Sequence, residues 1–322
     1  MSRPKNRKFE TYLQDQQANG KIEETLYSAL LALSRAAKDI AKLASENGLG
    51  SAAFLGALTG AENTDGDSQK ALDVLADDLI CSALSDTPIS AYLSEERDEA
   101  VCFNKPGRWV VACDPLDGSS NIDTNLTIGT IFSIYQAGET GWLMAGRAQK
   151  AAGFFAYGPQ TVLLLTIGDG VAGFCLDETG VFMEMDWQPE IMPTTSEFAI
   201  NAANRRFWPA HITQYIEGLL AGADGPRGQN FNMRWNGSLV ADAYRIFRRG
   251  GIFLYPEDSR KGYEAGRLRL VYEANPIAYL VEQAGGKASD GQRNILDIQP
   301  ESYHMRIPFI FGSRDEVDRV PL

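Results

Sequence analysis

The spacing of apolar residues predicts two amphipathic helices in the first quarter of the chain. Between residues 21 and 47, apolar side chains recur at alternating steps of four and three, as one buried helix face requires. A second helix is predicted over 68–84. Its expected buried side consists of Ala71, Leu72, Leu75, Ala76, Leu79 and Ile80. The segment 61–68 between them is rich in turn-forming and acidic residues, and we expect a mobile loop there.

Short apolar and β-branched runs predict a set of buried strands. The first two are RWVVAC (108–113) and TIGTIFSIY (127–135), and three short strands between 161 and 185 predict a meander. The rest of the chain mixes both kinds of element. We expect helices over 211–221, 237–248 and 275–284, and strands over 251–255 and 267–272.

This mixture predicts an α/β protein with two domains. A chain of 322 residues is long enough for one large or two ordinary domains. The segment 186–196 is irregular and contains proline, and the strand pattern resumes after it, so we expect a boundary near residue 197. The N-terminal domain would then span 1–197 and the C-terminal domain 198–322.

Charge and composition narrow the class of function. The chain has 42 acidic and 30 basic side chains and a formal net charge of −12, which repels nucleic-acid phosphates. No apolar run is long enough for a membrane helix. We therefore expect neither a nucleic-acid nor a membrane partner. With two histidines, the chain has little material for a Ser-His-Asp triad or a histidine-rich metal site, so carboxylates are the main candidates for chemistry.

The cysteines and the N-terminal segment favour a cytoplasmic protein. The four cysteines show no CxxC spacing, and three lie in apolar runs, so we expect reduced thiols in the core. The first ten residues are basic but lead into polar sequence, which argues against a secretory signal. We expect a frayed tail there.

The strongest local signal is CDPLDGSSNID (113–123), directly after a predicted buried strand. Asp114 and Asp117 lie on either side of Pro115, whose fixed φ stiffens the turn, so both carboxylates can point off the strand end. Hard oxygen ligands of this kind suit Mg²⁺. A plain Asp-Pro and Asp-Gly turn between two strands would have the same letters, and this motif alone does not decide between them.

The residues that follow are suited to a phosphate. Gly118 has no side chain to obstruct an approaching anion. Ser119, Ser120 and Asn121 add backbone N–H and side-chain polar groups that can hold it. Metal and phosphate would then be adjacent.

Three further acidic groups extend the pattern. Glu95 and Glu96 follow an apolar run, although adjacent glutamates are ordinarily a solvated surface. Glu273 lies between a predicted strand and a helix, where the helix N-terminus tolerates a carboxylate. Asp67 in the loop and Asp73 in the next helix form the third group.

In combination, these motifs resemble class I fructose-1,6-bisphosphatases from about residue 21 to the C-terminus. Inositol monophosphatases, which share D-P-x-D-G, lack most of the motifs. The markers, in chain order, are NTDGDSQKALDVLADDL (63–79), SEE (94–96), CDPLDGSSNID, TIGTIFSIY, NGSLVAD (236–242), GGIFLYP (250–256) and LRLVYEANPIAYLVEQAGG (268–286).

The resemblance implies a fold, an activity and a cofactor. The fold would be stacked α/β/α/β/α layers with mixed sheets, usually in a homotetramer. The enzyme would be a phosphoric monoester hydrolase of gluconeogenesis or the Calvin cycle. It would remove the 1-phosphate of D-fructose 1,6-bisphosphate by metal-activated water, using two or three Mg²⁺ ions per site, with Mn²⁺ able to substitute.

It also implies roles for individual residues. The metal ligands would be Glu95, Asp114, the Leu116 carbonyl, Asp117 and Glu273. The catalytic acids would be Asp67, Asp73 and Glu96. The 1-phosphate would be held by Gly118, Ser119, Ser120 and Arg269. The sugar and 6-phosphate would contact Asn201, Arg234, Trp235, Gly237, Ser238, Leu239, Tyr255 and Arg267, with Arg234 coming from a neighbouring subunit.

Some positions depart from the family pattern. Arg267 stands where a lysine is usual, and Trp235 and Asn204 replace tyrosines, which changes the expected geometry of the 6-phosphate site. The AMP-site Lys-Tyr pair reads Arg108-Trp109, and we expect weak or absent AMP inhibition. Two alternatives stay open: a broader bisphosphatase that also accepts sedoheptulose 1,7-bisphosphate, and a non-catalytic phosphosugar or metal-binding scaffold.

Overall fold

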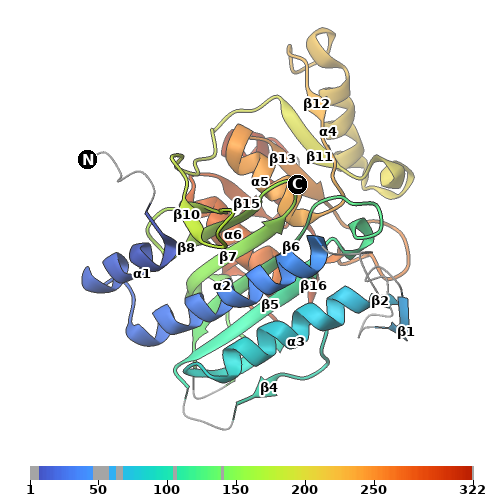
Figure 1. Ribbon diagram of the computed structural model, residues 1–322. Helices are drawn as coiled ribbons and strands as arrows, with labels where there is room; N and C mark the ends of the chain where they lie inside the picture. Colours follow the sequence, from blue (N-terminus) through green and yellow to red (C-terminus); the bar gives the residue numbers. More distant parts are fainter. Residues whose placement is uncertain (1–6, 46–57, 63–67, 104–106, 139–140, 321–322) are drawn as a thin grey trace.

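The computed structural model describes residues 7–45, 58–62, 68–103, 107–138 and 141–320 (Figure 1). The helices are α1 Phe9–Ala18, α2 Glu24–Ser45, α3 Ala71–Ser85, α4 Ala210–Leu220, α5 Leu239–Arg249, α6 Asn275–Gln283 and α7 Arg314–Val317. The strands of the first half are β1 Leu58–Glu62, β2 Ser68–Lys70, β3 Ile89–Ser94, β4 Val101–Cys102, β5 Trp109–Asp117, β6 Ile128–Gln136, β7 Gln149–Tyr157, β8 Thr161–Thr166, β9 Ala172–Leu176 and β10 Phe182–Glu184. Those of the second half are β11 Glu197–Ile200, β12 Asn232–Met233, β13 Ile252–Tyr255, β14 Leu268–Arg269, β15 Lys287–Ser289, β16 Arg306–Ile307 and β17 Phe309–Gly312.

Two mixed sheets organise the described residues. The first has eight strands in the order β10-β9-β8-β7-β6-β5-β3-β4, and its neighbours are antiparallel except for the parallel pair β3 and β5. The predicted meander is confirmed as β8-β9-β10. The second sheet has five described strands in the order β12-β11-β13-β17-β15. Two short pairs, β1-β2 and β14-β16, complete the described strands.

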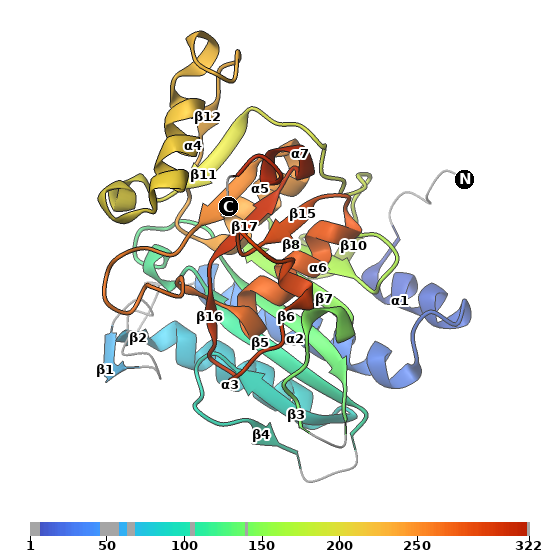
Figure 2. The same cartoon turned by 180° about the vertical axis from the view of Figure 1, so that it is seen from behind.

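Side chains from both faces of each sheet pack against helices, which gives the predicted layers. Along β6, Phe132 packs with α2 and α3, whereas its neighbour Ile131 packs with α5 and α6 on the other face. The second sheet packs one face on the same α5 and α6, and the other on α4 and α7. The layer order is therefore α/β/α/β/α (Figure 1 and Figure 2). Because the first sheet is buried on both faces, its central strands are continuous apolar runs.

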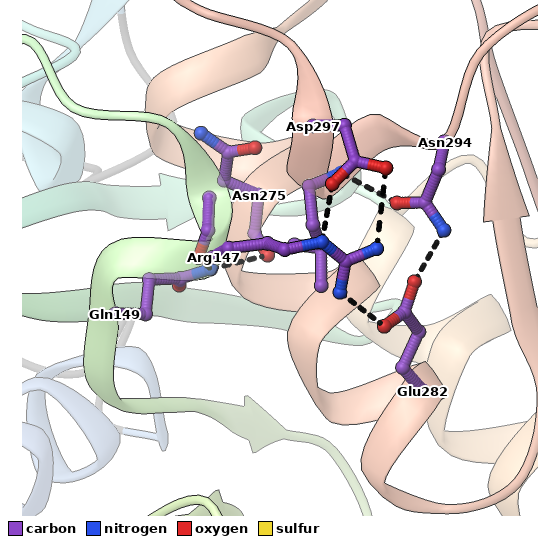
Figure 3. Close-up of polar contacts among 8 residues, drawn as sticks. Arg147, Gln149, Asn275, Glu282, Asn294 and Asp297 are labelled. Atoms are coloured by element: carbon purple, nitrogen blue, oxygen red, sulfur yellow. Dashed lines mark hydrogen bonds and ion pairs between the residues drawn. The ribbon is translucent and has the colours of Figure 1, made fainter.

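Ion pairs and hydrogen bonds link the segment between β6 and β7, and the start of β7, to α6 (Figure 3). The Arg147 guanidinium forms ion pairs with Asp297 and, at 3.2 Å, with Glu282 near the end of α6. At the start of α6, the buried Gln149 amide donates to the Asn275 carbonyl at 3.0 Å. Both ends of α6 are thus tied to the first sheet.

The first helices differ in detail from the prediction. The helix expected over 21–47 is α2, with its apolar face buried, and its expected last residues lie outside the described residues. In α3 the predicted buried side is wrong at Leu75, which is 40% exposed, and residues 68–70 form β2 instead of helix. The inward face of α3 carries Asp73 and Asp77. A prediction from hydrophobic periodicity places acidic residues on the solvent side, so it could not identify this face.

Three other expectations are also wrong. The tail expected to be frayed lies outside the described residues over 1–6, but it is helical from Phe9, where Phe9 and Tyr12 pack on Phe174. The strand expected over 267–272 is two residues long and continues as a π-helical turn, Leu270–Ala274. The cysteines are free, but Cys102 is exposed on the edge strand β4. The loop expected over 61–68 falls largely outside the described residues.

Candidate active site

The parallel pairing of β3 and β5 brings the first two acids together. Strands that run parallel end at the same edge of a sheet, and here Ser94 at the end of β3 lies opposite Cys113. The next residues of the two strands are Glu95 and Asp114. The Glu95 N–H donates to the Cys113 carbonyl at 3.0 Å, which fixes the backbone where the two carboxylates diverge from the sheet.

A bulge in β5 turns Asp114 and Asp117 to the same side. Asp114 pairs with Ile131 and Asp117 with Gly129, so β5 has one more residue than β6 between these pairs. Residues two apart on β6 share a face, so their two partners share one as well. Pro115 fits the irregular stretch because it has no N–H to pair, and its carbonyl accepts from the Thr130 hydroxyl at 2.8 Å.

Glu273 joins these acids from the second half of the chain. It lies in the π-helical turn before α6, is 5% exposed, and accepts a 2.6 Å hydrogen bond from the Arg269 N–H. One carboxylate oxygen each of Glu95, Asp114 and Glu273 lies within 4.8 Å of the other two. Arg269 is close to the same group, with its guanidinium 2.8 Å from Glu95.

Burial and mutual repulsion both disfavour ionisation of this cluster. Burial, followed by the charge of Glu95, raises the pKa of Asp114 well above its usual range. The same two causes raise the pKa of Glu273. Burial also raises the pKa of Asp117, to about 6, against the lowering effect of its hydrogen bonds to Ser238 and Val240. Without a cation, these carboxyl groups therefore hold their protons to higher pH than exposed carboxyl groups do.

These features fit a divalent metal ion. Three converging carboxylate oxygens are hard ligands of the kind that Mg²⁺ and similar ions prefer. A bound cation would oppose both the burial and the repulsion that raise the pKa values, and would favour the ionised carboxylates. If Glu273 were only an acid that stabilises the start of a helix, its carboxylate would not need to converge with those of Glu95 and Asp114.

Asp117 has a second structural task in this site. One of its oxygens accepts from the Ser238 hydroxyl at 2.7 Å and from the Val240 N–H at 2.9 Å, and the other accepts from the Leu239 N–H at 3.1 Å. These donors form the N-terminus of α5, where a carboxylate is favoured. Asp117 is not one of the three clustered ligands, but it lies in the same pocket and raises the pKa of Asp114.

Almost all of the described candidate residues line one pocket of about 710 Å³. Two candidates do not line it: Arg234 is exposed outside it, and Asn121 is buried with its amide donating to the Thr127 and Asn236 carbonyls. Asp67 lies outside the described residues. The candidates that line the pocket are Asp73, Glu95, Glu96, Asp114, Leu116, Asp117, Gly118, Ser119, Ser120, Asn201, Trp235, Gly237, Ser238, Leu239, Tyr255, Arg267, Arg269 and Glu273. Sequence reasoning gave no role to Asp123, Phe253 and Leu268, although all three lie within the quoted motifs, in CDPLDGSSNID, GGIFLYP and the segment 268–286.

The glycine at the pocket floor is required by close packing. Gly118 has φ +77°, and a Cβ placed there would lie 2.7 Å from the Ser238 Cβ. The 3₁₀ turn Ser119–Asn121 begins directly after it. Gly118 therefore packs directly against the start of α5. Ser119 and Ser120, which follow it, line the pocket.

The far end of the pocket is aromatic and basic. The Trp235 ring stacks on Phe253 with centroids 5.6 Å apart and also contacts Tyr255. Arg267 donates to the Tyr263 hydroxyl at 2.9 Å. This end of the pocket thus offers a flat apolar surface and a cation, which suit the ring and the phosphate of a phosphorylated sugar.

Comparison with known proteins decides the family. The model of the fructose-1,6-bisphosphatase N-terminal domain matches residues 7–186, and that of the C-terminal domain matches residues 191–322. The chain belongs to the fructose-1,6-bisphosphatase family. This membership confirms the resemblance drawn from the sequence motifs and implies a divalent metal cofactor.

Curated relatives and a solved structure agree with this assignment. The chain is 48% identical to a class 1 fructose-1,6-bisphosphatase of Sinorhizobium medicae over 97% of this chain and 91% of the relative. It is 53% identical to that of Paracoccus denitrificans over 80% of this chain and 79% of the relative. The holo structure of Leishmania major fructose-1,6-bisphosphatase superimposes with a TM-score of 0.90 at 31% identity, covering 98% of both chains. Among the described residues, no helix combines the length and apolar character needed to cross a membrane.

Proposed function

We propose that the chain hydrolyses the 1-phosphate of D-fructose 1,6-bisphosphate to fructose 6-phosphate and phosphate. Membership of the family and the names of the relatives support this activity. The observation that carries it is the buried carboxylate cluster beside the Gly118 turn, in a pocket that also contains Arg267 and Arg269. Acceptance of sedoheptulose 1,7-bisphosphate is not favoured, because the relatives are named for the fructose substrate alone.

The acidic cluster would hold the cofactor. The ligands would be Glu95, Asp114, the Leu116 carbonyl, Asp117 and Glu273, around two or three Mg²⁺ ions, with Mn²⁺ able to substitute. When bound, such ions neutralise charge on the phosphate and lower the pKa of a coordinated water. The chain itself contributes the rigid edge formed by β3, β5 and the π-helical turn.

Other acids would direct the attacking water. Asp73 and Glu96 line the pocket beside the cluster, and a carboxylate there can accept the proton that the water loses. Asp67 would act with them. None of these steps needs a histidine, which agrees with a chain that has two.

The remaining residues would hold and orient the substrate. Gly118, Ser119, Ser120 and Arg269 would bind the 1-phosphate, and Arg269 would exchange part of its pairing with Glu95 for the phosphate oxygens. The sugar and 6-phosphate would lie against Asn201, Trp235, Gly237, Ser238, Leu239, Tyr255 and Arg267. Arg234, exposed next to β12, would extend into the pocket of a neighbouring subunit in a homotetramer.

We also propose the domain boundary near residue 197 and a cytoplasmic location. The last strand of the first sheet ends at Glu184 and the first strand of the second begins at Glu197, which supports the boundary. Free cysteines support a reducing compartment. The reaction would serve gluconeogenesis or the Calvin cycle.

One assay tests the proposal. Phosphate release is measured from fructose 1,6-bisphosphate, fructose 6-phosphate and sedoheptulose 1,7-bisphosphate, with Mg²⁺ and with a chelator. We expect Mg²⁺-dependent release from the first compound, a kcat/KM several-fold lower for the third, and none from the second. No release from fructose 1,6-bisphosphate with excess Mg²⁺ at neutral and alkaline pH would refute the function. It would favour the alternative that the protein is a non-catalytic phosphosugar or metal-binding scaffold.

A further inference from the structure

Asp77 on α3 is a buried acid that the proposed reaction does not use. It is four residues after Asp73, so both side chains lie on the inward face of the helix. Asp73 lines the active-site pocket, whereas Asp77 does not. Asp77 is 4% exposed, and a carboxylate buried to that extent needs strong partners.

Asp77 is bound by three residues from the end of β3 and the turn that follows it. One oxygen accepts from the Tyr92 hydroxyl at 2.9 Å and from the Ser94 hydroxyl at 2.6 Å. The other accepts from the Arg97 guanidinium at 2.5 Å. Ser94 and Arg97 directly flank Glu95 and Glu96.

The hydrogen bonds continue into the backbone of the glutamate segment at Glu96. The Ser94 hydroxyl, which donates to Asp77, accepts from the Glu96 N–H at 3.2 Å. On the other side of the turn, the Arg97 carbonyl lies 3.1 Å from His304 Nε2. One carboxylate on α3 therefore holds both ends of the segment that carries a metal-cluster residue and a candidate base.

We infer that Asp77 is a positioning residue, which sets the placement of Glu95 in the metal cluster and of Glu96 beside the attacking water. This inference deepens the proposed function and rests on it. Partners of metal ligands that lie one step outside the site typically change metal affinity or activity by about 10- to 100-fold when they are removed. A shift of about 1 Å in a catalytic group has a similar effect on turnover.

The test replaces Asp77 by Asn. The amide can still accept from Tyr92 and Ser94, but it has no second acceptor for the Arg97 guanidinium. The matched control is Asp78→Asn, because Asp78 neighbours Asp77, also binds Arg97 at 2.9 Å, and is 66% exposed. Both variants lose one charge from the same helix beside the same arginine, but Asp78 accepts from Arg97 through a single oxygen, which the amide retains.

Two measurements are made on the full-length protein: Mn²⁺ affinity by titration calorimetry without substrate, and kcat and KM for phosphate release. For Asp77→Asn we expect Mn²⁺ binding about tenfold weaker and kcat about 10- to 100-fold lower. The KM should stay within about twofold, since the sugar contacts come from the other half of the pocket. Asp78→Asn should match the wild type in all three quantities.

Equal Mn²⁺ affinity and kcat in Asp77→Asn and Asp78→Asn would overturn the inference, even if Asp77→Asn unfolded at a lower temperature. If Asp77→Asn does not fold, Ser94→Ala is used, because it breaks only the link from Asp77 to the Glu96 N–H. Unchanged Mn²⁺ affinity and kcat in that variant would overturn it equally. Failure of the proposed function is distinguishable, because then the wild type itself would release no phosphate, while the Mn²⁺ titration would still compare the variants.

Discussion

Replacing Asp114 by Asn should abolish phosphatase activity and at the same time stabilise the metal-free protein. The change removes one negative charge from the buried cluster of Asp114, Glu95 and Glu273. It keeps the size of the side chain, and the amide oxygen can still accept the 3.0 Å hydrogen bond from the Leu116 N–H. The expected gain in stability therefore comes from charge alone.

The geometry sets the size of this gain. Two unit charges 4.8 Å apart repel by about 3.5 kcal/mol at an effective dielectric constant of about 20. Asp114 has two such neighbours at or within this distance, which gives about 7 kcal/mol if all three acids are ionised and nothing compensates them. Arg269 compensates Glu95 in part, and retained protons lower the repulsion further. We expect a net gain of about 2–4 kcal/mol in the free energy of unfolding near pH 8.

The same electrostatic effects determine how the stability of the metal-free protein depends on pH. The folded-state pKa values of Asp114 and Glu273 are raised, so below the pKa of the unfolded chain these groups are protonated in both states and cost no stability. As pH rises above about 4, the unfolded state loses these protons more readily, and the metal-free fold loses stability. For Asp117 the loss extends from 3.8 to about 6 and amounts to about 3 kcal/mol. For the other two acids it continues to higher pH.

Urea unfolding in EDTA at about pH 5 and pH 8 measures these effects. The wild type should be less stable at pH 8 than at pH 5, and Asp114→Asn should reduce that difference. Adding Mg²⁺ should stabilise the wild type through binding but leave Asp114→Asn nearly unchanged. The control is Asp123→Asn, an exposed acid of the same pocket, which should behave as the wild type. The reasoning fails if Asp114→Asn is no more stable than the wild type in EDTA at pH 8.

Three further changes test other parts of the site. Glu96→Gln should lower kcat at least about 100-fold with little change in KM, because it removes a base and leaves the phosphate contacts; steady-state kinetics with an unchanged kcat would exclude Glu96 from the mechanism. Gly118→Ala should destabilise the protein by about 1–3 kcal/mol and reduce kcat, because the new Cβ would meet Ser238 at a positive φ. Thermal unfolding and turnover equal to those of the wild type would contradict that packing. AMP at millimolar concentration should inhibit weakly or not at all, because the Trp109 indole is 4% exposed and donates to the Thr25 hydroxyl at 2.9 Å instead of offering a phenol to a ligand. Potent AMP inhibition in the same assay would disprove this.

Local patterns predicted the elements better than they predicted the site geometry. The apolar runs located β5 and β6 because strands buried on both faces are continuously apolar. The β5 bulge could not be read from the letters, although it is what turns Asp114 and Asp117 to one side. A regular strand would have separated them, since residues three apart point to opposite faces. The motif pointed to Asp114 and Asp117 but gave no sign of the bulge that turns them to one side.

The errors share a physical cause. Hydrophobic periodicity assumes that acids face solvent, so it assigned Leu75 to the inside of α3 and gave no role to Asp77. The run before α6 has the composition of a strand, but it forms a π-helical turn in which the Glu273 side chain accepts from the N–H of Arg269, the residue before the turn. At functional sites, long-range polar contacts override local preference. These contacts are set by the fold and leave no periodic signal.

The π-helical turn has a further consequence for how this chain can change over evolutionary time. Glu273 reaches the acidic cluster from one half of the molecule, while Glu95 and Asp114 come from the other. The orientation of Glu273 depends on α6, whose two ends are bound by Arg147 and Gln149. Recombination that exchanged one half for that of a distant homologue would have to preserve these contacts between the halves. Otherwise the chain could fold while Glu273 no longer reached Glu95 and Asp114.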